Sequence, residues 1–179
     1  MKKIRYFLVA LALLTTTFIL IRNSDPGPQF LDAQFSDIIN YIPERAKRNM
    51  EVSEVDVAWH LDHSLKTINH ICEALEASNP NTYRSNFNFS RMVVFTMGAF
   101  PRGVAESPQL VRPPKTISTD SLYLQMEEAR KNLKRIERLD KKVHFKHPYF
   151  NVIDKGQTKR FLKIHTDHHL KIVRDILKN

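Results

Sequence analysis

Histidine is the residue type in this chain that is best suited to chemistry. The sequence has 8 histidines and a single cysteine, Cys72. One cysteine excludes an intrachain disulfide framework and a multi-cysteine zinc or iron–sulfur site. The 4 glycines do not cluster, which excludes the glycine-rich loops that cradle phosphates. The search for a functional site therefore starts from the imidazoles.

Two histidines share the apolar face of the last predicted helix, about 156–177. At about 100° per residue, His165 and His169 lie among Phe161, Ile172 and Ile176, whereas His168 lies at the edge of this face. Because His165 and His169 are four residues apart, both rings project from adjacent turns toward one point. Buried imidazoles need polar partners. A bound metal or hydrogen bonds within the core would supply them, and both interpretations stay open.

A third histidine comes from a long helix predicted over 53–77, with Ser53 as its N-cap. His60 lies on the margin of the apolar face of this helix, whereas His63 and His70 lie further round. We therefore expect His60, and not His63, to reach the interior. On the same helix, Cys72 is expected to be a small buried hydrophobic residue.

His60, His165 and His169 together form a predicted three-imidazole metal site. Nitrogen ligands of this kind suit zinc, nickel or ferrous iron. Three protein ligands leave one position open for water or substrate, as in catalytic metal sites. His144 and His147 fall in a predicted loop and are expected to be surface or turn residues.

The elements that would position these residues are all helical. Further helices are predicted over 33–41, 90–98 and 119–140, with a proline-rich loop over 100–119. No segment shows the sustained period-two alternation that a sheet requires. The chain is long enough for one ordinary domain, and we expect an all-α fold, an antiparallel bundle of four or five helices.

The N-terminal segment, residues 1–22, directs the chain to a membrane. Lys2, Lys3 and Arg5 precede an uncharged run over 6–21, which as a helix spans about 24 Å. No small-residue cleavage site follows, so we expect an uncleaved single-pass anchor with the rest of the chain on the extracytoplasmic side. The alternative is a cleaved signal and a secreted or periplasmic protein. Residues 23–48 are predicted to form a linker and a short helix, and 49–179 the bundle domain.

The net charge of +9 does not indicate a nucleic-acid partner. Four of the positive charges belong to the anchor segment, and the remaining excess is concentrated over 127–146. Aromatic residues do not interleave this basic stretch before Phe145, so it offers no platform for stacking bases. We interpret it as a solvated helix face.

The sequence around these histidines resembles a known family. Trp59-His60-Leu61 and the His165–Leu170 run, H-T-D-H-H-L, are similar to motifs of the DinB-like superfamily of metal-binding four-helix bundles. The run His147-Pro148-Tyr149-Phe150 resembles the branch catalogued as domain of unknown function family 1569. The resemblance covers about 49–177. Asn151 departs from it, because that branch usually has glycine at this place.

The resemblance implies an antiparallel four-helix bundle after the anchor, with a metal on His60, His165 and His169. Characterised relatives include transferases and isomerases that use low-molecular-weight thiols. The function expected is therefore a membrane-tethered, metal-dependent thiol transferase or hydrolase acting on a small-molecule substrate, with its catalytic residues unassigned. The alternative is a non-enzymatic structural or sensing bundle, in which the histidines bind a stabilising metal or none. A homodimer stays open.

Overall fold

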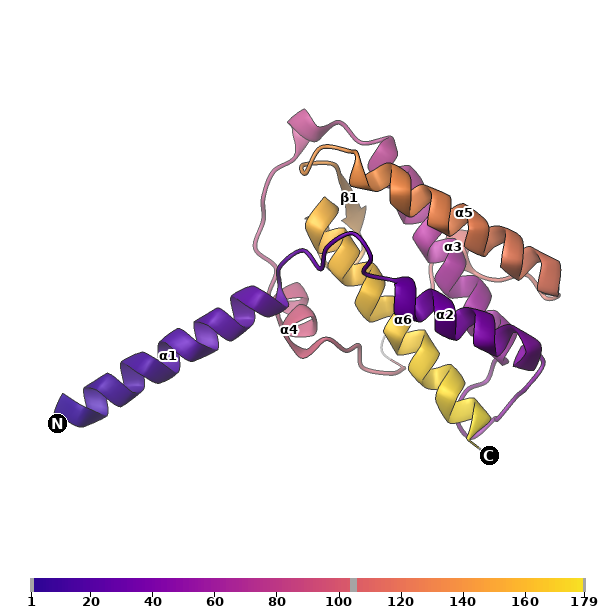
Figure 1. Cartoon of the computed structure of the whole chain (residues 1–179), viewed down its shortest axis with the longest axis horizontal. Coiled ribbons are helices and arrows are strands. Elements are labelled where there is room, and N and C mark those ends of the chain that lie inside the picture. Colours follow the sequence, from indigo (N-terminus) through magenta and orange to yellow (C-terminus); the bar gives the residue numbers. More distant parts are fainter. Residues whose placement is uncertain (1, 104–105, 179) are drawn as a thin grey trace.

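A computed structural model describes residues 2–103 and 106–178 of the chain, and these residues are mostly helical (Figure 1). The α-helices are α1 (Lys2–Arg22), α2 (Asp32–Tyr41), α3 (Val57–Glu76), α4 (Phe89–Met97), α5 (Thr119–Glu137) and α6 (Lys155–Leu177). Short 3-10 helices are η1 (Ile42–Glu44), η2 (Pro80–Thr82) and η3 (Gln109–Val111), and the strands are β1 (His144–His147) and β2 (Asn151–Asp154). The expectation of a predominantly helical chain is confirmed.

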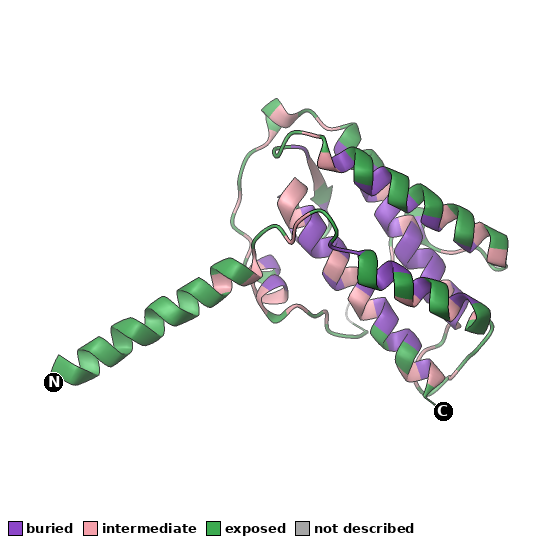
Figure 2. Cartoon of the chain, viewed as in Figure 1, coloured by how far each residue is buried: buried purple, intermediate pink, exposed green. Residues whose placement is uncertain are grey.

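The hydrophobic core lies between the long helices. Helix α3 packs against both α5 and α6, and α2 packs against α6. Figure 2 shows buried residues along most of α3 and α6, whereas the outer face of α5 is exposed. The core includes the fully buried side chains Leu61, Leu65, Ile68, Leu75, Leu122, Ile136, Leu162 and Val173. Burial on more than one side of α3 determines which of its residues reach the site.

The N-cap of α3 differs from the prediction. The helix begins after Asp56, whose carboxylate accepts a hydrogen bond from the Trp59 N–H at 2.9 Å, and not after Ser53. Ser53 Oγ instead lies 3.0 Å from His60 Nε2, so this hydroxyl belongs to a polar contact of the site. Asp154 and Gln157 form a capping box at the start of α6, and this fixes the first turn of the helix that carries His165.

The expectation of no sheet was wrong, because β1 and β2 form an antiparallel hairpin. The register pairs His144 with Asp154 and His147 with Asn151. Each strand has only four residues, too few for alternation to stand out in the sequence. Asn151 has a φ of 61°, in the left-handed region that glycine prefers and asparagine tolerates. A residue able to adopt this conformation is what the tight turn requires.

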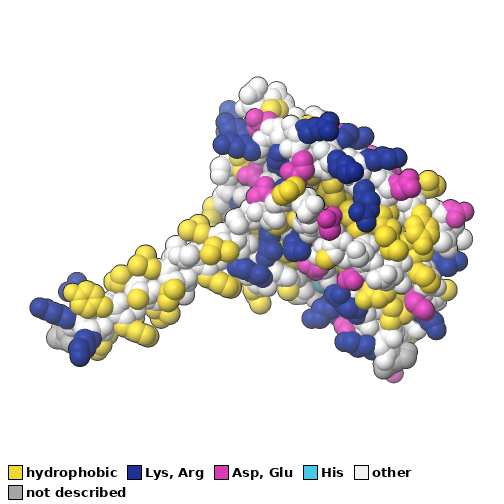
Figure 3. Space-filling model, in the orientation of Figure 1, with side chains coloured by type: hydrophobic (Ala, Val, Ile, Leu, Met, Phe, Trp, Pro, Cys, Tyr) yellow, Lys and Arg dark blue, Asp and Glu magenta, His cyan; other side chains and the backbone are white. Residues whose placement is uncertain are grey.

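Helix α1 projects away from the rest of the protein and is exposed along its length (Figures 1 and 2). Figure 3 shows hydrophobic side chains along this helix and Lys and Arg side chains at its free end. Its 21 residues extend about 32 Å, enough to cross a bilayer core of about 30 Å. By length and composition, α1 can be a membrane anchor or a signal sequence.

The end of α1 and the segment after it are attached to the body. Arg22 Nε donates to the Thr96 carbonyl at 3.0 Å, and its Nη2 donates to the Met97 carbonyl at 3.3 Å, at the C-terminus of α4. Further on, Asp25 pairs with the buried Lys159 of α6 at 2.9 Å. Lys159 also pairs with Glu137 at 2.8 Å. These contacts connect α1 to α4, α5 and α6.

Candidate metal centre

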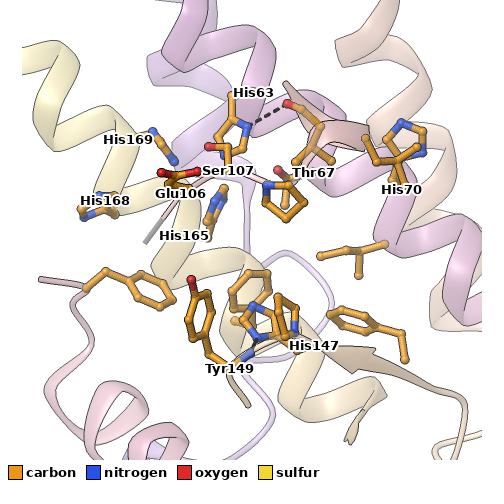
Figure 4. A pocket seen from close by; sticks show the side chains of 18 of the residues that line it. His63, Thr67, His70, Glu106, Ser107, His147, Tyr149, His165, His168 and His169 are labelled. Atoms are coloured by element: carbon orange, nitrogen blue, oxygen red, sulfur yellow. Dashed lines mark hydrogen bonds between the residues drawn. The ribbon is translucent and has the colours of Figure 1, made fainter. Parts of the chain in front are cut away.

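Three histidines from α3 and α6 form a cluster that can hold a metal ion. His63, His165 and His169 each offer one ring nitrogen, and these nitrogens all lie within 4.8 Å of one another. The ring centroids are 5.1 Å apart for His63 and His165, 4.7 Å for His63 and His169, and 4.6 Å for His165 and His169. Figure 4 shows the three rings turned toward a common point. The i, i+4 spacing of His165 and His169 produces their half of the cluster.

The protonation state of His63 follows from its hydrogen bond. His63 Nδ1 lies 2.9 Å from the carbonyl oxygen of Val111, the last residue of η3 (Figure 4). A carbonyl oxygen only accepts, so Nδ1 carries the proton. The neutral ring then has its lone pair on Nε2, which is free to bind a metal. Orientation of a ligand ring by such a backbone contact is typical of metal-binding histidines.

His60 contacts the cluster from behind. Its Nδ1 lies 3.0 Å from His169 Nδ1, and its Nε2 lies 3.0 Å from Ser53 Oγ. Two proton arrangements satisfy both contacts: His169 Nδ1–H donates to His60 Nδ1 and His60 Nε2–H donates to Ser53, or Ser53 donates to His60 Nε2 and His60 Nδ1–H donates to His169 Nδ1. The first arrangement leaves a lone pair on His169 Nε2, so metal binding at this nitrogen requires it. His60 is thus placed to orient His169.

The histidines of the cluster are neutral. Burial lowers the pKa of His60 to about 4 and lowers the pKa of His63. The pKa values of His165 and His169 lie well below the ordinary range of histidine. Burial is the larger cause, and repulsion from the other nearby histidines is the smaller one. Metal binding requires the neutral form of histidine, so the cluster does not have to release protons near neutral pH.

The cluster lies at one end of a cavity of about 370 Å³. Its walls are formed by α3, α6, residues within 100–103 and 106–111, and the β1–β2 hairpin, and most of the lining side chains are apolar or aromatic. Thr67 lies one turn beyond His63 and has a buried hydroxyl with no hydrogen-bond partner among the described residues. Glu106 is the one carboxylate among the described lining residues, and its side chain is mostly exposed.

His147 lies in the cavity wall. It was expected to be a surface or turn residue; it does end β1 directly before the hairpin turn, but the surface position was wrong, because the residue is only 8% exposed. Its ring stacks on Phe150 with centroids 4.6 Å apart. The backbone N–H groups of Tyr149 and Phe150 donate to His147 Nδ1 at 3.1 and 3.2 Å, so the proton of the neutral ring is on Nε2. Burial lowers its pKa to about 4. His147 is a neutral hydrogen-bond donor.

The prediction that His60 reaches the interior is confirmed, but the exclusion of His63 was wrong. His60 is 4% exposed and His63 is 3% exposed. The helical-wheel argument assigned α3 one buried face, whereas η3 covers a second face through the Val111 contact. His63 takes the place in the compact trio that the sequence assigned to His60. Ligation by His60 stays a prediction from the sequence alone.

Cys72 and two arginines that could take part in chemistry lie outside the lining of the cavity. Cys72 is fully buried, as predicted, and burial raises the pKa of its thiol to about 12. The Arg91 guanidinium is occupied by backbone carbonyls of the hairpin. The Arg102 side chain pairs with Asp175. Neither arginine lines the cavity.

The chain was compared with protein-family models, curated proteins and solved structures, and no match was found in any of the three comparisons. The interpretation of its function therefore depends on the geometry of the histidine cluster and the cavity beside it.

Proposed function

We propose that the chain is a membrane-tethered enzyme in which His63, His165 and His169 hold a divalent zinc, nickel or iron ion. The proposed reaction is thiol transfer or hydrolysis on a small-molecule substrate. The observation that carries this proposal is the compact cluster of three neutral imidazoles at the end of a cavity large enough for a ligand.

The residues present fit a metal. His165 Nδ1 is buried without a hydrogen-bond partner among the described residues, which is costly unless something binds there. The hydrogen bond to the Val111 carbonyl holds the proton of His63 on Nδ1, so Nε2 has a free lone pair. Three nitrogen ligands with open coordination positions are the arrangement of catalytic zinc sites.

Such an ion would lower the pKa of a bound water or thiol and supply a nucleophile at neutral pH. The protein's own groups would do the rest. Glu106, at the mouth of the cavity, can accept the proton of the nucleophile. The unpartnered Thr67 hydroxyl and His147 Nε2–H can donate hydrogen bonds to polar atoms of the substrate. The apolar walls exclude water from the remaining volume.

The proposal also includes membership of the DinB-like superfamily and of its branch, family 1569. The packing of α3 against α5 and α6, and of α2 against α6, supports these helices as the antiparallel four-helix bundle of the DinB-like superfamily. The positive φ of Asn151 supports kinship with family 1569, whose members usually have glycine there. Low-molecular-weight thiols are the co-substrates that this kinship suggests.

The proposal also includes the orientation of the chain in the membrane. The basic residues at the free end of α1 favour a cytoplasmic N-terminus and an extracytoplasmic body. Arg22, at the other end of α1, donates hydrogen bonds to the carbonyls of Thr96 and Met97. Its positive charge is therefore accounted for by the contact with α4 and does not argue against this topology. A cleaved signal is the alternative, and detection of residues 1–22 in the mature membrane protein distinguishes the two.

The test is metal content followed by activity. The full chain, purified from membranes, should contain about one transition metal per molecule by elemental mass spectrometry. His165→Ala should lose this metal, and His70→Ala, which changes a partly exposed histidine outside the trio, should retain it. Metal-loaded protein is then assayed for thiol transfer with glutathione and for hydrolysis of ester and amide substrates.

Glu106→Gln tests the proposed proton acceptor separately from metal binding. It should lower kcat while the metal content stays unchanged. A wild-type protein without metal after reconstitution would refute the proposal. A metal that raises the melting temperature while all assays remain negative would instead support the non-enzymatic stabilised bundle.

A further inference from the structure

A second cavity, of about 630 Å³, adjoins the first one beside α4. Its lining is almost wholly apolar and includes Phe89, Val93, Val94, Met97 and Phe150. Phe100, Pro101 and Tyr149 line both cavities. The two cavities are therefore neighbours across these shared side chains. We call the second cavity the α4 groove.

The Phe100 ring lies between the α4 groove and the cavity of the metal centre, since it lines both. Its centroid lies 6.3 Å from that of His165 and 5.9 Å from that of His168. The same ring stacks on Phe150 with centroids 5.9 Å apart. Phe100 thus contacts two histidines of the metal cavity and also lines the α4 groove.

Helix α4 has one face buried against the body and one exposed face with large apolar side chains. Arg91 and Phe95 are buried against the body, whereas the opposite face carries Phe89 and Met97, which are 65% and 71% exposed. Phe87, just before the helix, is 76% exposed. Large apolar side chains gathered on one surface mark an interaction site and not a solvated face.

The contact between α4 and the end of α1 indicates a membrane as the partner of this surface. Arg22, the last residue of α1, donates to the Thr96 and Met97 carbonyls, so the C-terminus of α4 is held at the end of the membrane-directing helix (Figure 1). Asn23 Nδ2 donates to Thr96 Oγ1 at 3.0 Å and strengthens this attachment. When α1 spans a bilayer, these contacts place the C-terminal end of α4, which carries the exposed Met97, next to the bilayer surface, where insertion of apolar side chains is favourable.

We propose that the ligand of the α4 groove is a membrane lipid and that this lipid is the substrate class of the metal centre. An alkyl chain occupies the groove beside α4, and the polar head extends past Phe100 toward His63, His165 and His169. The proposal rests on the metal centre for its chemistry and on the anchor for its geometry. A bilayer lipid is favoured over a soluble metabolite because the groove is apolar and located at the anchored end.

Photocrosslinking of the full chain in phosphatidylcholine nanodiscs tests this proposal. One probe is phosphatidylcholine with a diazirine near the end of an acyl chain, and the second carries the diazirine on its head group. Peptide mass spectrometry should find acyl-chain adducts in α4 and at Phe100 in addition to α1. The head-group probe should label 145–149, which line the metal cavity.

Ser90→Trp is the variant that fills the groove, because Ser90 is exposed and belongs to its lining. It should reduce the α4 and Phe100 adducts at least tenfold while the α1 adducts stay constant. Leu124→Trp, on the exposed face of α5, is the matched control and should leave all adducts unchanged. Metal content, measured on the same samples, shows that the histidine cluster is intact in each variant.

Adducts confined to α1, or equal α4 labelling in Ser90→Trp and wild type, would overturn the lipid proposal. Head-group labelling only at the ends of α1 would overturn it as well, because the lipid would then not reach the cavity. If metal is bound in these cases, the metal centre stands and only the substrate class is refuted. Groove adducts in a protein that binds no metal would refute the metal centre, and with it the role of the lipid as substrate.

Discussion

Replacement of His63 should remove metal binding, whereas replacement of His60 should only weaken it. The structure places His63 in the trio of converging nitrogens and His60 behind His169. His63→Ala deletes one of three ligands. His60→Ala deletes the group that orients a ligand, so the two variants separate these roles.

The magnitudes follow from these positions. Removal of a hydrogen-bonded partner of a metal-binding histidine lowers metal affinity about 10- to 100-fold, or about 1.4 to 2.8 kcal/mol. The 3.0 Å contact of His60 with His169 puts His60→Ala in this range. His63→Ala should exceed it, with a loss of more than about 100-fold, because the two remaining nitrogens both come from α6.

Competition with a chromophoric zinc chelator gives the dissociation constant for each variant. A second readout comes from Trp59, the one tryptophan in the chain, whose ring stacks on His63 with centroids 4.9 Å apart. Cobalt or nickel bound at the cluster should quench its fluorescence. His70→Ala is the control and should match wild type in both measurements.

The opposite ranking would refute the reasoning. If His60→Ala abolished zinc binding and His63→Ala preserved it within tenfold, then His60 would be the ligand, as the sequence suggested. Equal and small effects of both variants would show that the metal does not bind between α3 and α6.

Three further predictions concern stability and reactivity. His147 is neutral in the folded protein with a pKa of about 4 and titrates near 6.5 when unfolded, so its stabilising contribution is complete above pH 6.5 and is lost as the pH falls toward 4. His147→Asn should remove about 3 kcal/mol of this pH dependence in denaturant titrations, and parallel wild-type and variant curves would contradict it. Lys159→Ala should lower the free energy of unfolding by about 3 kcal/mol, because it leaves the Glu137 carboxylate, whose Oε1 is buried, without its cation and also breaks the pair with Asp25; a loss below about 1 kcal/mol would show that the pairs are dispensable. Cys72 should resist iodoacetamide in the native protein and react only after unfolding, and rapid native alkylation would show that this part of the core opens.

Local sequence patterns predicted the parts of the structure that depend on local chemistry. Prolines and capping residues located the helices to within a few residues, and the expectation that Ser118 or Thr119 begins α5 agrees with the observed Ser118 cap. The four-residue spacing of His165 and His169 predicted that their rings meet, and their centroids are 4.6 Å apart. The burial of Cys72 followed from its position near the apolar face of α3.

The remaining features depend on contacts between distant residues. His63 is brought into the cluster by the Val111 carbonyl, 48 residues away, and no periodicity within α3 reports that contact. The β1–β2 hairpin is too short for a strand pattern, and its turn depends on the left-handed conformation of Asn151. The burial of His147 follows from that hairpin, since Phe150 and Phe161 enclose its ring.

Helix α6 is attached near the end of α1 and also carries two of the three clustered histidines. Lys159 binds Asp25, and Arg160 Nη2 donates to the Phe95 carbonyl of α4 at 2.7 Å. His165 follows Lys159 by about 9 Å along the helix axis. With α1 as a membrane anchor, these contacts would keep the cavity close to the bilayer. Encounter with the proposed lipid would then be a search in two dimensions, whose rate depends on the number of lipid molecules per unit area and not on a concentration in the surrounding water.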